Sequence, residues 1–431
     1  MEQSMISGEM RPAVSPMGSA GDREFVIIGL TDNRSPWFPP EVVSEIKSSR
    51  VFSGGRRHHE IVAAMLPQDA EWIDITVPID AVFGVYENYR ERIVVFASGD
   101  PLFFGFANTV RRKLPFVPIR LYPAFNSLQT LAHRMVIPYH DMRVVSLTGR
   151  PWHGLDRALI ECCPLIGVLT DRERTPAAIA RRMMDFGYDN YLMTVGENLG
   201  NAERERITTQ TVGEAAEREF SSPNCIILTA TYRRERRFGI PDTEFDHLPG
   251  RSRMITKMPI RLLALQALGL PSRSVLWDIG FCTGSVSIEA KMQFPHLEVV
   301  SFEVRSEGKA LIEANSRRFG IPGIKTVIGD FLDADLSVLP RPDAVFIGGH
   351  GGRLSEIMAR VAYLLPDAGS RCPDGLRTMT HGGVIVMNSV SEDSRKAFEA
   401  TARELGLTFR PVAHVALDDY NPIDILKAEK S

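Results

Sequence analysis

The residues with the clearest chemical potential lie in one turn of the C-terminal half. Residues 276–290 read LWDIGFCTGSVSIEA, in which an apolar strand pattern passes through a turn of small residues into a helical pattern. Small residues in such a turn let a ligand approach the backbone closely. The segment therefore predicts a small-molecule site. Its candidate residues are Asp278, Gly280, Phe281, Cys282, Thr283 and Gly284.

Acids at the ends of two later strand patterns narrow the class of ligand. Glu303 lies 19 residues after Gly284, where its carboxylate can accept hydrogen bonds from both hydroxyls of a ribose. Asp330 and Phe331 close a third strand, where the acid and the adjoining backbone can flank an adenine. A dinucleotide site also has a ribose-binding acid, but it needs a G-x-G-x-x-G run and an open helix start for its pyrophosphate. The turn lacks that run, so it favours a sulfonium nucleoside.

The elements around this turn predict the sheet that positions it. An amphipathic pattern predicts a helix at 259–268. Apolar runs predict strands at 274–279, 298–303, 325–328, 344–347 and 383–387. Strands and helices in this alternation form a doubly wound parallel sheet, whose ligands lie beyond the carboxyl ends of the strands. We therefore expect the candidate residues to share one sheet edge.

The N-terminal half has a second series of strand and helix patterns. Helices are predicted at 40–48 and 176–186. Strands are predicted at 23–30, 92–97, 142–147, 165–169 and 225–230. This half is thus also an α/β domain.

A chain of 431 residues exceeds what one hydrophobic core usually organises, which predicts two domains. A charge run followed by turn residues predicts a linker with few core contacts. We expect a flexible tail at 1–22, a first domain at 23–235, the linker at 236–250 and a second domain at 251–431.

Composition excludes several classes of protein. The formal net charge of −3 argues against a protein that coats nucleic acid. No apolar run approaches the roughly 18–20 residues that cross a bilayer, so no membrane association is expected. The five cysteines show no metal-ligand spacing, which predicts no metal site and indicates a reducing, cytoplasmic setting.

Seven sequence segments resemble two families of corrin-pathway methyltransferases. In the second half, MITKMPIR (254–261), LWDIG (276–280) and FIGGHGG (346–352) resemble the CbiT family, which methylates and decarboxylates a corrin precursor. In the first half, FASGDPLFFG (96–105), PAFNSLQ (123–129), SLTGRP (146–151) and ENLG (197–200) resemble the CbiE family of tetrapyrrole methylases. The two in this order, over about residues 23–431, are similar to the fused, decarboxylating precorrin-6Y methyltransferases of cobalamin biosynthesis.

The resemblance implies a tetrapyrrole methylase-type α/β domain followed by a Rossmann-like methyltransferase domain, each with a site for S-adenosyl-L-methionine. In the second domain, Thr256, the 280–284 turn, Glu303 and the Asp330–Phe331 step would surround the donor. Gly348, Gly349 and Gly351 would face a precorrin macrocycle. Asp330 and His350 are the candidates for proton handling. The implied first-domain donor site consists of Gly29, Gly99, Asp100, Pro101, Leu102, Asn126 and Ser127.

The resemblance further implies methylation of precorrin-6Y, or its cobalt counterpart, at carbons 5 and 15, loss of the carbon 12 acetate carboxylate, and a homo-oligomer. Three features depart from the family pattern: Cys282 replaces a glycine, LTDN follows Gly29, and residues 367–380 form an insertion. We expect the backbone at Cys282 to tolerate its side chain. Two other functions stay open. The chain could methylate another small molecule or RNA, or it could be a tetrapyrrole-binding scaffold.

Overall fold

The computed structural model describes residues 23–251, 253–370, 382–417 and 421–430. The expected tail at 1–22 and most of the expected insertion at 367–380 lie outside these ranges. The chain divides into two compact units. The first comprises the chain up to Tyr139 with Val195–Thr208 and Ser221–Cys225, and the second comprises the remainder.

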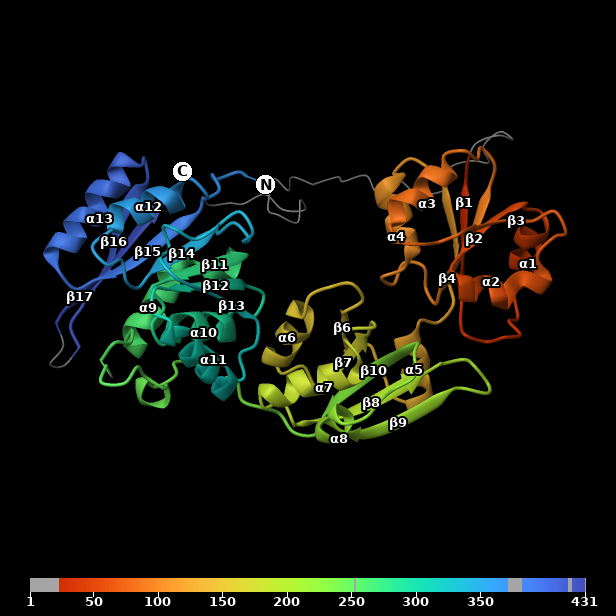
Figure 1. Cartoon of the computed structure of the whole chain (residues 1–431), viewed down its shortest axis with the longest axis horizontal. Helices are drawn as coiled ribbons and strands as arrows, with labels where there is room; N and C mark the ends of the chain where they lie inside the picture. The colour runs from red at the N-terminus through yellow and green to blue at the C-terminus, as the bar shows by residue number, and fades with distance from the viewer. Residues whose placement is uncertain (1–22, 252, 371–381, 418–420, 431) are drawn as a thin grey trace, which may run out of the picture. The chain divides into compact units, whose positions relative to one another are not determined.

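The first unit contains a five-stranded sheet in the order β3-β2-β4-β1-β5 (Figure 1). Its neighbouring strands β3 and β2, β2 and β4, β4 and β1, and β1 and β5 all run parallel. Its strands are β1 (Phe25–Leu30), β2 (Val51–Gly54), β3 (Glu71–Asp74), β4 (Ile93–Ser98) and β5 (Ile119–Tyr122). Its helices are α1 (Pro40–Lys47), α2 (Arg56–Val62), α3 (Ile79–Tyr86), α4 (Phe106–Lys113) and α5 (Ser127–Met135), with a 3-10 turn at Ala63–Met65.

Both faces of this sheet are covered by helices, which explains why β1 is apolar throughout. Phe25 and Ile27 pack in one cluster with residues of α3 and α4, and Val26 and Ile28 pack in another with residues of α1 and α2. Successive side chains of a strand point to opposite faces, so a strand buried on both sides needs a continuous apolar run. Figure 1 shows the two helix pairs on opposite sides of the sheet.

The second unit begins with the elements of a five-stranded sheet in the order β6-β7-β10-β8-β9. The division between the units cuts through three of these strands, β8, β9 and β10. The strands are β6 (Arg143–Ser146), β7 (Leu165–Leu169), β8 (Tyr191–Glu197), β9 (Arg206–Thr211) and β10 (Asn224–Ala230). The helices are α6 (His153–Ile160), α7 (Pro176–Asp185) and α8 (Val212–Ala216).

A seven-stranded sheet in the order β13-β12-β11-β14-β15-β17-β16 forms the rest of the second unit. Its strands are β11 (Val275–Ile279), β12 (Glu298–Glu303), β13 (Ile324–Ile328), β14 (Ala344–Ile347), β15 (Val384–Ser389), β16 (Thr408–Val415) and β17 (Ile423–Glu429). Its helices are α9 (Met258–Leu268), α10 (Ser285–Gln293), α11 (Glu307–Phe319), α12 (Leu354–Ala362) and α13 (Glu392–Glu404), with 3-10 turns at Asp242–Glu244 and Leu270–Ser272.

From β11 the sheet continues through β12 and β13 on one side and through β14 and β15 on the other. The boundary between β11 and β14 is therefore the switch point, the place where a doubly wound sheet binds ligands. The expectation of a wholly parallel sheet is wrong at one edge, because β17 runs antiparallel to β15 and to β16. The antiparallel strand β17 is next to the edge strand β16, far from β11, and it leaves the switch point unchanged.

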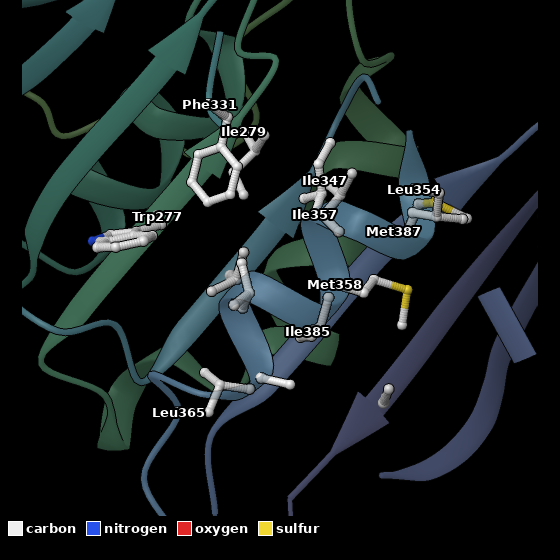
Figure 2. Packing of buried hydrophobic residues seen from close by; sticks show 14 of the residues in the cluster. Trp277, Ile279, Phe331, Ile347, Leu354, Ile357, Met358, Leu365, Ile385 and Met387 are labelled. Atoms are coloured by element: carbon white, nitrogen blue, oxygen red, sulfur yellow. The ribbon is translucent and has the colours of Figure 1, made fainter. Parts of the chain in front are cut away.

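The strand that carries the turn is fixed by packing on both faces. Trp277 and Ile279 of β11 pack with α12 residues such as Met358, whereas Leu276 packs with α9 and α10. Figure 2 shows Trp277, Ile279 and Phe331 in the first of these clusters, near Ile347 and Ile357. The end of β11 is therefore held rigidly.

The expected linker at 236–250 has more core contacts than its charge run predicts. Ile240 and Phe245 are buried in a cluster with Ile288 and Met292 of α10. The backbone nitrogens of Gly239 and Ile240 each donate to the Glu289 carboxylate at 2.9 Å. The expectation of few core contacts is wrong, because a few spaced apolar residues suffice to anchor a segment that has no regular periodicity.

Candidate active sites

A cavity of about 570 Å³ opens at the carboxyl ends of the central strands of the seven-stranded sheet. Its wall contains most of the residues predicted for the second domain. These are Thr256, Asp278, Gly280, Phe281, Cys282, Glu303, Asp330, Phe331, Gly348, Gly349, His350 and Gly351. Thr283 and Gly284 are not among the lining residues. The Thr283 side chain is buried, and Gly284 is the N-cap residue of α10.

The turn after β11 passes close to the glycine loop after β14. A Cβ atom on Gly280 would lie 2.7 Å from the nitrogen of Gly349, closer than real Cβ atoms approach, and the φ of Gly280 is +77°. Only glycine therefore fits there without a shift of the backbone. The nitrogens of Gly280 and Phe281 both donate to the Phe302 carbonyl, at 2.8 and 3.2 Å, which ties the turn to the end of β12.

The backbone at Cys282, which we expect to tolerate a side chain, is left-handed. Its φ is +51°, in the left-handed region where a side chain is disfavoured. The turn thus keeps the conformation that favours glycine. The nitrogen of Cys282 donates to Oε2 of Glu303 at 2.9 Å, and its Sγ lies 3.0 Å from the Met254 carbonyl oxygen. Burial raises the pKa of the thiol.

Glu303 is held in place by the turn and by the residues that follow it. Besides Cys282, the backbone nitrogen and the guanidinium of Arg305 donate to Oε1, at 3.2 and 3.0 Å. The carboxylate is buried but lines the cavity. Each carboxylate oxygen can accept two hydrogen bonds or more, so acceptor capacity is left for a ligand hydroxyl.

Asp278 is fully buried at the cavity wall and only half satisfied. Ser287 donates to its Oδ2 at 2.6 Å, and Ser287 in turn shares a hydrogen bond of 2.7 Å with Ser301. Its Oδ1 has no hydrogen-bond partner in the described chain. Burial raises the pKa of the Asp278 carboxyl to about 7. A cationic group brought next to this carboxyl would stabilise its ionised form.

Asp330 and Phe331 have different surroundings although they are adjacent. Asp330 accepts from the Leu332 nitrogen at 2.9 Å and forms an ion pair with Arg353 at 2.9 Å. The Phe331 ring belongs to the core, edge-on to Phe302 with the ring centres 5.0 Å apart. Asp330 is therefore oriented by the residue that precedes α12.

His350 sits in the glycine loop with a defined hydrogen-bonding pattern. Its Nδ1 accepts from the Gly352 nitrogen at 3.2 Å, so the neutral ring carries its proton on Nε2. Burial lowers the pKa of His350, which favours this neutral form. The ring can therefore donate one hydrogen bond from Nε2 to a ligand.

A second cavity, of about 790 Å³, lies in the first unit at the carboxyl ends of β1, β4 and β5. Gly29 and Asp100 line it, with Tyr122, Ala124 and Gln129. A Cβ atom on Gly29 would overlap the Gly99 carbonyl oxygen and lie 2.6 Å from the Ala124 nitrogen. The backbones at the ends of these three strands are therefore too close together for side chains to lie between them.

The other predicted residues of the first domain surround this meeting point without lining the cavity. Asn126 caps α5 by accepting from the Gln129 nitrogen at 2.9 Å, and Ser127 is the first residue of that helix. Gly99 lies against Asn126, and Pro101 follows it in the loop. Leu102 is exposed, and its backbone N–H donates a hydrogen bond to the Asp100 carboxylate at 2.8 Å.

Sequence reasoning missed several residues on the two walls. Arg253 and Asn388 line the cavity of the second unit, and Trp37 and Phe125 line that of the first. Trp37 and Phe125 are unusually exposed for aromatic residues, at 81% and 60%. The runs of turn residues around Trp37 carried no signal that would have placed it at a cavity.

In the comparison with known proteins, each half of the chain matches a methyltransferase family. The family model for the precorrin methyltransferase domain matches residues 250–423, and the model for tetrapyrrole (corrin/porphyrin) methylases matches residues 39–216. A precorrin-6Y C(5,15)-methyltransferase [decarboxylating] of Sinorhizobium sp is 31% identical over 370 residues, which are 85% of this chain and 84% of that protein. The chain belongs to the family of decarboxylating precorrin-6Y C(5,15)-methyltransferases.

Two relatives outside the fused family match parts of the chain. A cobalt-precorrin-6B C(15)-methyltransferase (decarboxylating) of Salmonella typhimurium is 40% identical over 111 residues, 26% of this chain and 56% of that protein. A cobalt-precorrin-7 C(5)-methyltransferase of the same organism is 28% identical over 182 residues, 42% of this chain and 87% of that protein. In the described chain, every helix is too short or too polar to span a bilayer.

Proposed function

We propose that this chain methylates precorrin-6Y at carbons 5 and 15 and removes the carboxylate of the carbon 12 acetate, with S-adenosyl-L-methionine as the methyl donor. The observation that carries the proposal is the cavity at the switch point, which Glu303, Asp278 and His350 all line. The chain that contains this cavity belongs to the family described above. The activities named for the two Salmonella relatives favour assigning carbon 15 and the decarboxylation to the second half, and carbon 5 to the first.

The residues on the wall of the cavity in the second unit fit the proposed donor. Three of the about four acceptor positions of the buried Glu303 carboxylate are taken, which leaves one for a ribose hydroxyl, and Oδ1 of Asp278 is an unsatisfied acceptor for an ammonium group. The backbone at Gly280 leaves room for close approach. When bound, the donor supplies an electrophilic methyl group on its sulfonium.

The protein's part in methyl transfer is to position the reactants. The bridging carbons of a precorrin are electron-rich, so no side-chain nucleophile is required. The cavity wall must hold the ring carbon in line with the methyl group and exclude water, and such placement can supply much of a rate enhancement.

Decarboxylation leaves an electron pair that the conjugated ring system can accept, and His350 is the better placed of the two residues predicted to handle protons. Asp330 would first have to leave its ion pair with Arg353. Burial lowers the pKa of His350 and so favours its neutral form, whose Nε2 can donate a hydrogen bond to a ring carboxylate.

The first half would hold its donor mainly with backbone. Gly29, Gly99 and Ala124 approach too closely for side chains to intervene, so peptide groups form the wall of this cavity. Trp37 and Phe125 present apolar ring surface that suits a flat macrocycle.

The stoichiometry of donor binding tests the proposal. Isothermal titration of the full chain with S-adenosyl-L-homocysteine should reveal two sites per chain. One site would instead favour a methyltransferase for another small molecule or RNA, with the first domain as a substrate-binding module. The absence of any site would favour a tetrapyrrole-binding scaffold. The homo-oligomer implied by the family resemblance can be tested by analytical ultracentrifugation.

A further inference from the structure

Asn388 is the one polar side chain near the end of β15 that reaches the cavity wall of the second unit. The four residues before it, Val384 to Met387, are apolar and buried, whereas Asn388 lines the cavity. Met387 pairs with Ile347 of β14, so Asn388 comes at the level where β14 opens into the glycine loop. The amide therefore lies at the same sheet edge as the predicted site.

The oxygen of the Asn388 amide, Oδ1, is buried and makes no hydrogen bond within the described chain. Asn315, a buried amide of the same unit, differs: its Oδ1 accepts from Asp246 at 2.8 Å, and its Nδ2 donates to the Thr283 carbonyl at 3.0 Å. An unpaired buried amide costs stability that an apolar side chain of similar size would avoid.

Asn388 has two apolar neighbours on the cavity wall. Val390 follows β15 and is 66% exposed, and Ile423 begins β17. The residues predicted for the donor come from the ends of β11, β12 and β13, and β14 separates those strands from β15 in the sheet. The wall thus has a donor side and a second side with two apolar side chains and one amide.

The charge on the wall fits an anionic ligand. Arg305 pairs with Glu303 and Arg353 pairs with Asp330, but Arg253 has no ion-pair partner among the described residues. The guanidinium of Arg253 is therefore available to a ligand, whereas the buried Asp278 carboxyl on the same wall has its pKa raised to about 7. The guanidinium charge favours a ligand with carboxylates.

Resting on the function proposed above, we propose that Asn388, Val390 and Ile423 form the macrocycle-binding side of the cavity, and that the Asn388 amide donates a hydrogen bond to a ring carboxylate. A precorrin is flat, with apolar ring faces and carboxylates at its periphery. The terminal torsion of asparagine is soft, so the amide can turn its Nδ2 toward the ligand at small cost. Asn388 is then a specificity residue for the substrate.

The test compares variants of the full chain in methylation of precorrin-6Y, donor binding and thermal unfolding. Asn388→Leu should raise the KM for the tetrapyrrole about 10- to 150-fold, as expected for the loss of one hydrogen bond to a charged carboxylate. It should leave the dissociation constant of the donor unchanged and should not lower Tm. Asn315→Leu is the matched control, because it removes a satisfied amide and should lower Tm.

Asn388→Asp tests whether the amide donates a hydrogen bond to the ligand or accepts one from it. A carboxylate at this position would repel a ring carboxylate, so the KM should rise further than in Asn388→Leu. A KM close to that of the wild type in Asn388→Asp would show that the position accepts a hydrogen bond and would overturn the assignment to a ring carboxylate.

The other outcomes distinguish this inference from the proposed function. If the wild type methylates precorrin-6Y and Asn388→Leu has an unchanged KM, the inference alone is overturned. A lowered Tm in Asn388→Leu would likewise overturn it, because the amide would then be structural. If the wild type leaves precorrin-6Y unmethylated, the proposed function fails and the inference fails with it.

Discussion

Replacing Glu303 by glutamine tests the donor site with little disturbance of its shape. The side chain is 3% exposed, and its carboxylate accepts from the Cys282 nitrogen at 2.9 Å and from the Arg305 guanidinium at 3.0 Å. Glutamine keeps the volume and one acceptor oxygen, so the turn can retain its hydrogen bond from Cys282. Glu303→Ala would leave that nitrogen without its partner and would confuse binding with folding.

The expected effect on binding exceeds the expected effect on stability. A hydrogen bond to a charged group contributes about 1.5–3 kcal/mol, so losing the charge should weaken donor binding about 10- to 150-fold. The Arg305 side chain is 35% exposed, and screening by water limits the ion pair to about 1 kcal/mol or less. The variant should therefore remain folded.

The assay is isothermal titration of the full chain with S-adenosyl-L-homocysteine. In Glu303→Gln, one of the two expected sites should weaken and the other should keep its affinity. Glu313→Gln is the control, because Glu313 is an exposed acid on α11 outside the cavity wall. Unchanged affinity at both sites of Glu303→Gln would refute the assignment of Glu303 to the donor.

Changes at three further positions test the two cavities. Asp278 has a pKa raised to about 7, so affinity for a cationic donor should increase between about pH 6 and pH 8, and Asp278→Asn should flatten this titration curve. The pKa of Asp278 is higher in the folded than in the unfolded state, so protonated Asp278 stabilises the fold. This stabilisation is complete below about pH 4 and is lost as the pH rises through about 7. Measuring the free energy of unfolding as a function of pH would show the loss. Cys282→Gly should keep donor binding, because glycine readily adopts a φ of +51°. Cys282→Trp should abolish decarboxylation. A Cys282→Trp protein that still releases carbon dioxide would show that the turn does not hold the donor. Gly29→Ala should abolish methylation at carbon 5 and preserve decarboxylation, because its Cβ would overlap the Gly99 carbonyl oxygen; mass analysis showing normal carbon 5 methylation would contradict the first site.

The fold was predictable where burial demands continuous apolar runs. The observed bounds of β7, β12 and β14 equal the predicted ranges. Short strands such as β3, in which Trp72 and Ile73 lie between acids, have too few apolar residues to give a signal. The β16–β17 pair was also missed, because β16 is exposed or half-buried along its whole length and has no continuous apolar run.

The site was predictable where strand ends fix the spacing. The turn at Gly280 and the acid at Glu303 lie one strand apart in the sequence, so their meeting follows from the alternation of elements. Asn388 has no motif, and only its unpaired oxygen and its place on the wall single it out. The left-handed residue Cys282 donates its backbone N–H to Glu303, a tertiary contact that no local pattern encodes.

The product formed from precorrin-6Y is the most direct test of the central claim. The full chain should be incubated with precorrin-6Y and methyl-labelled S-adenosyl-L-methionine, and the product analysed by mass spectrometry. The account predicts two added labelled methyl groups and the loss of one carbon dioxide. A product with no added methyl group, or one that retains every carboxylate after both methylations, would contradict it.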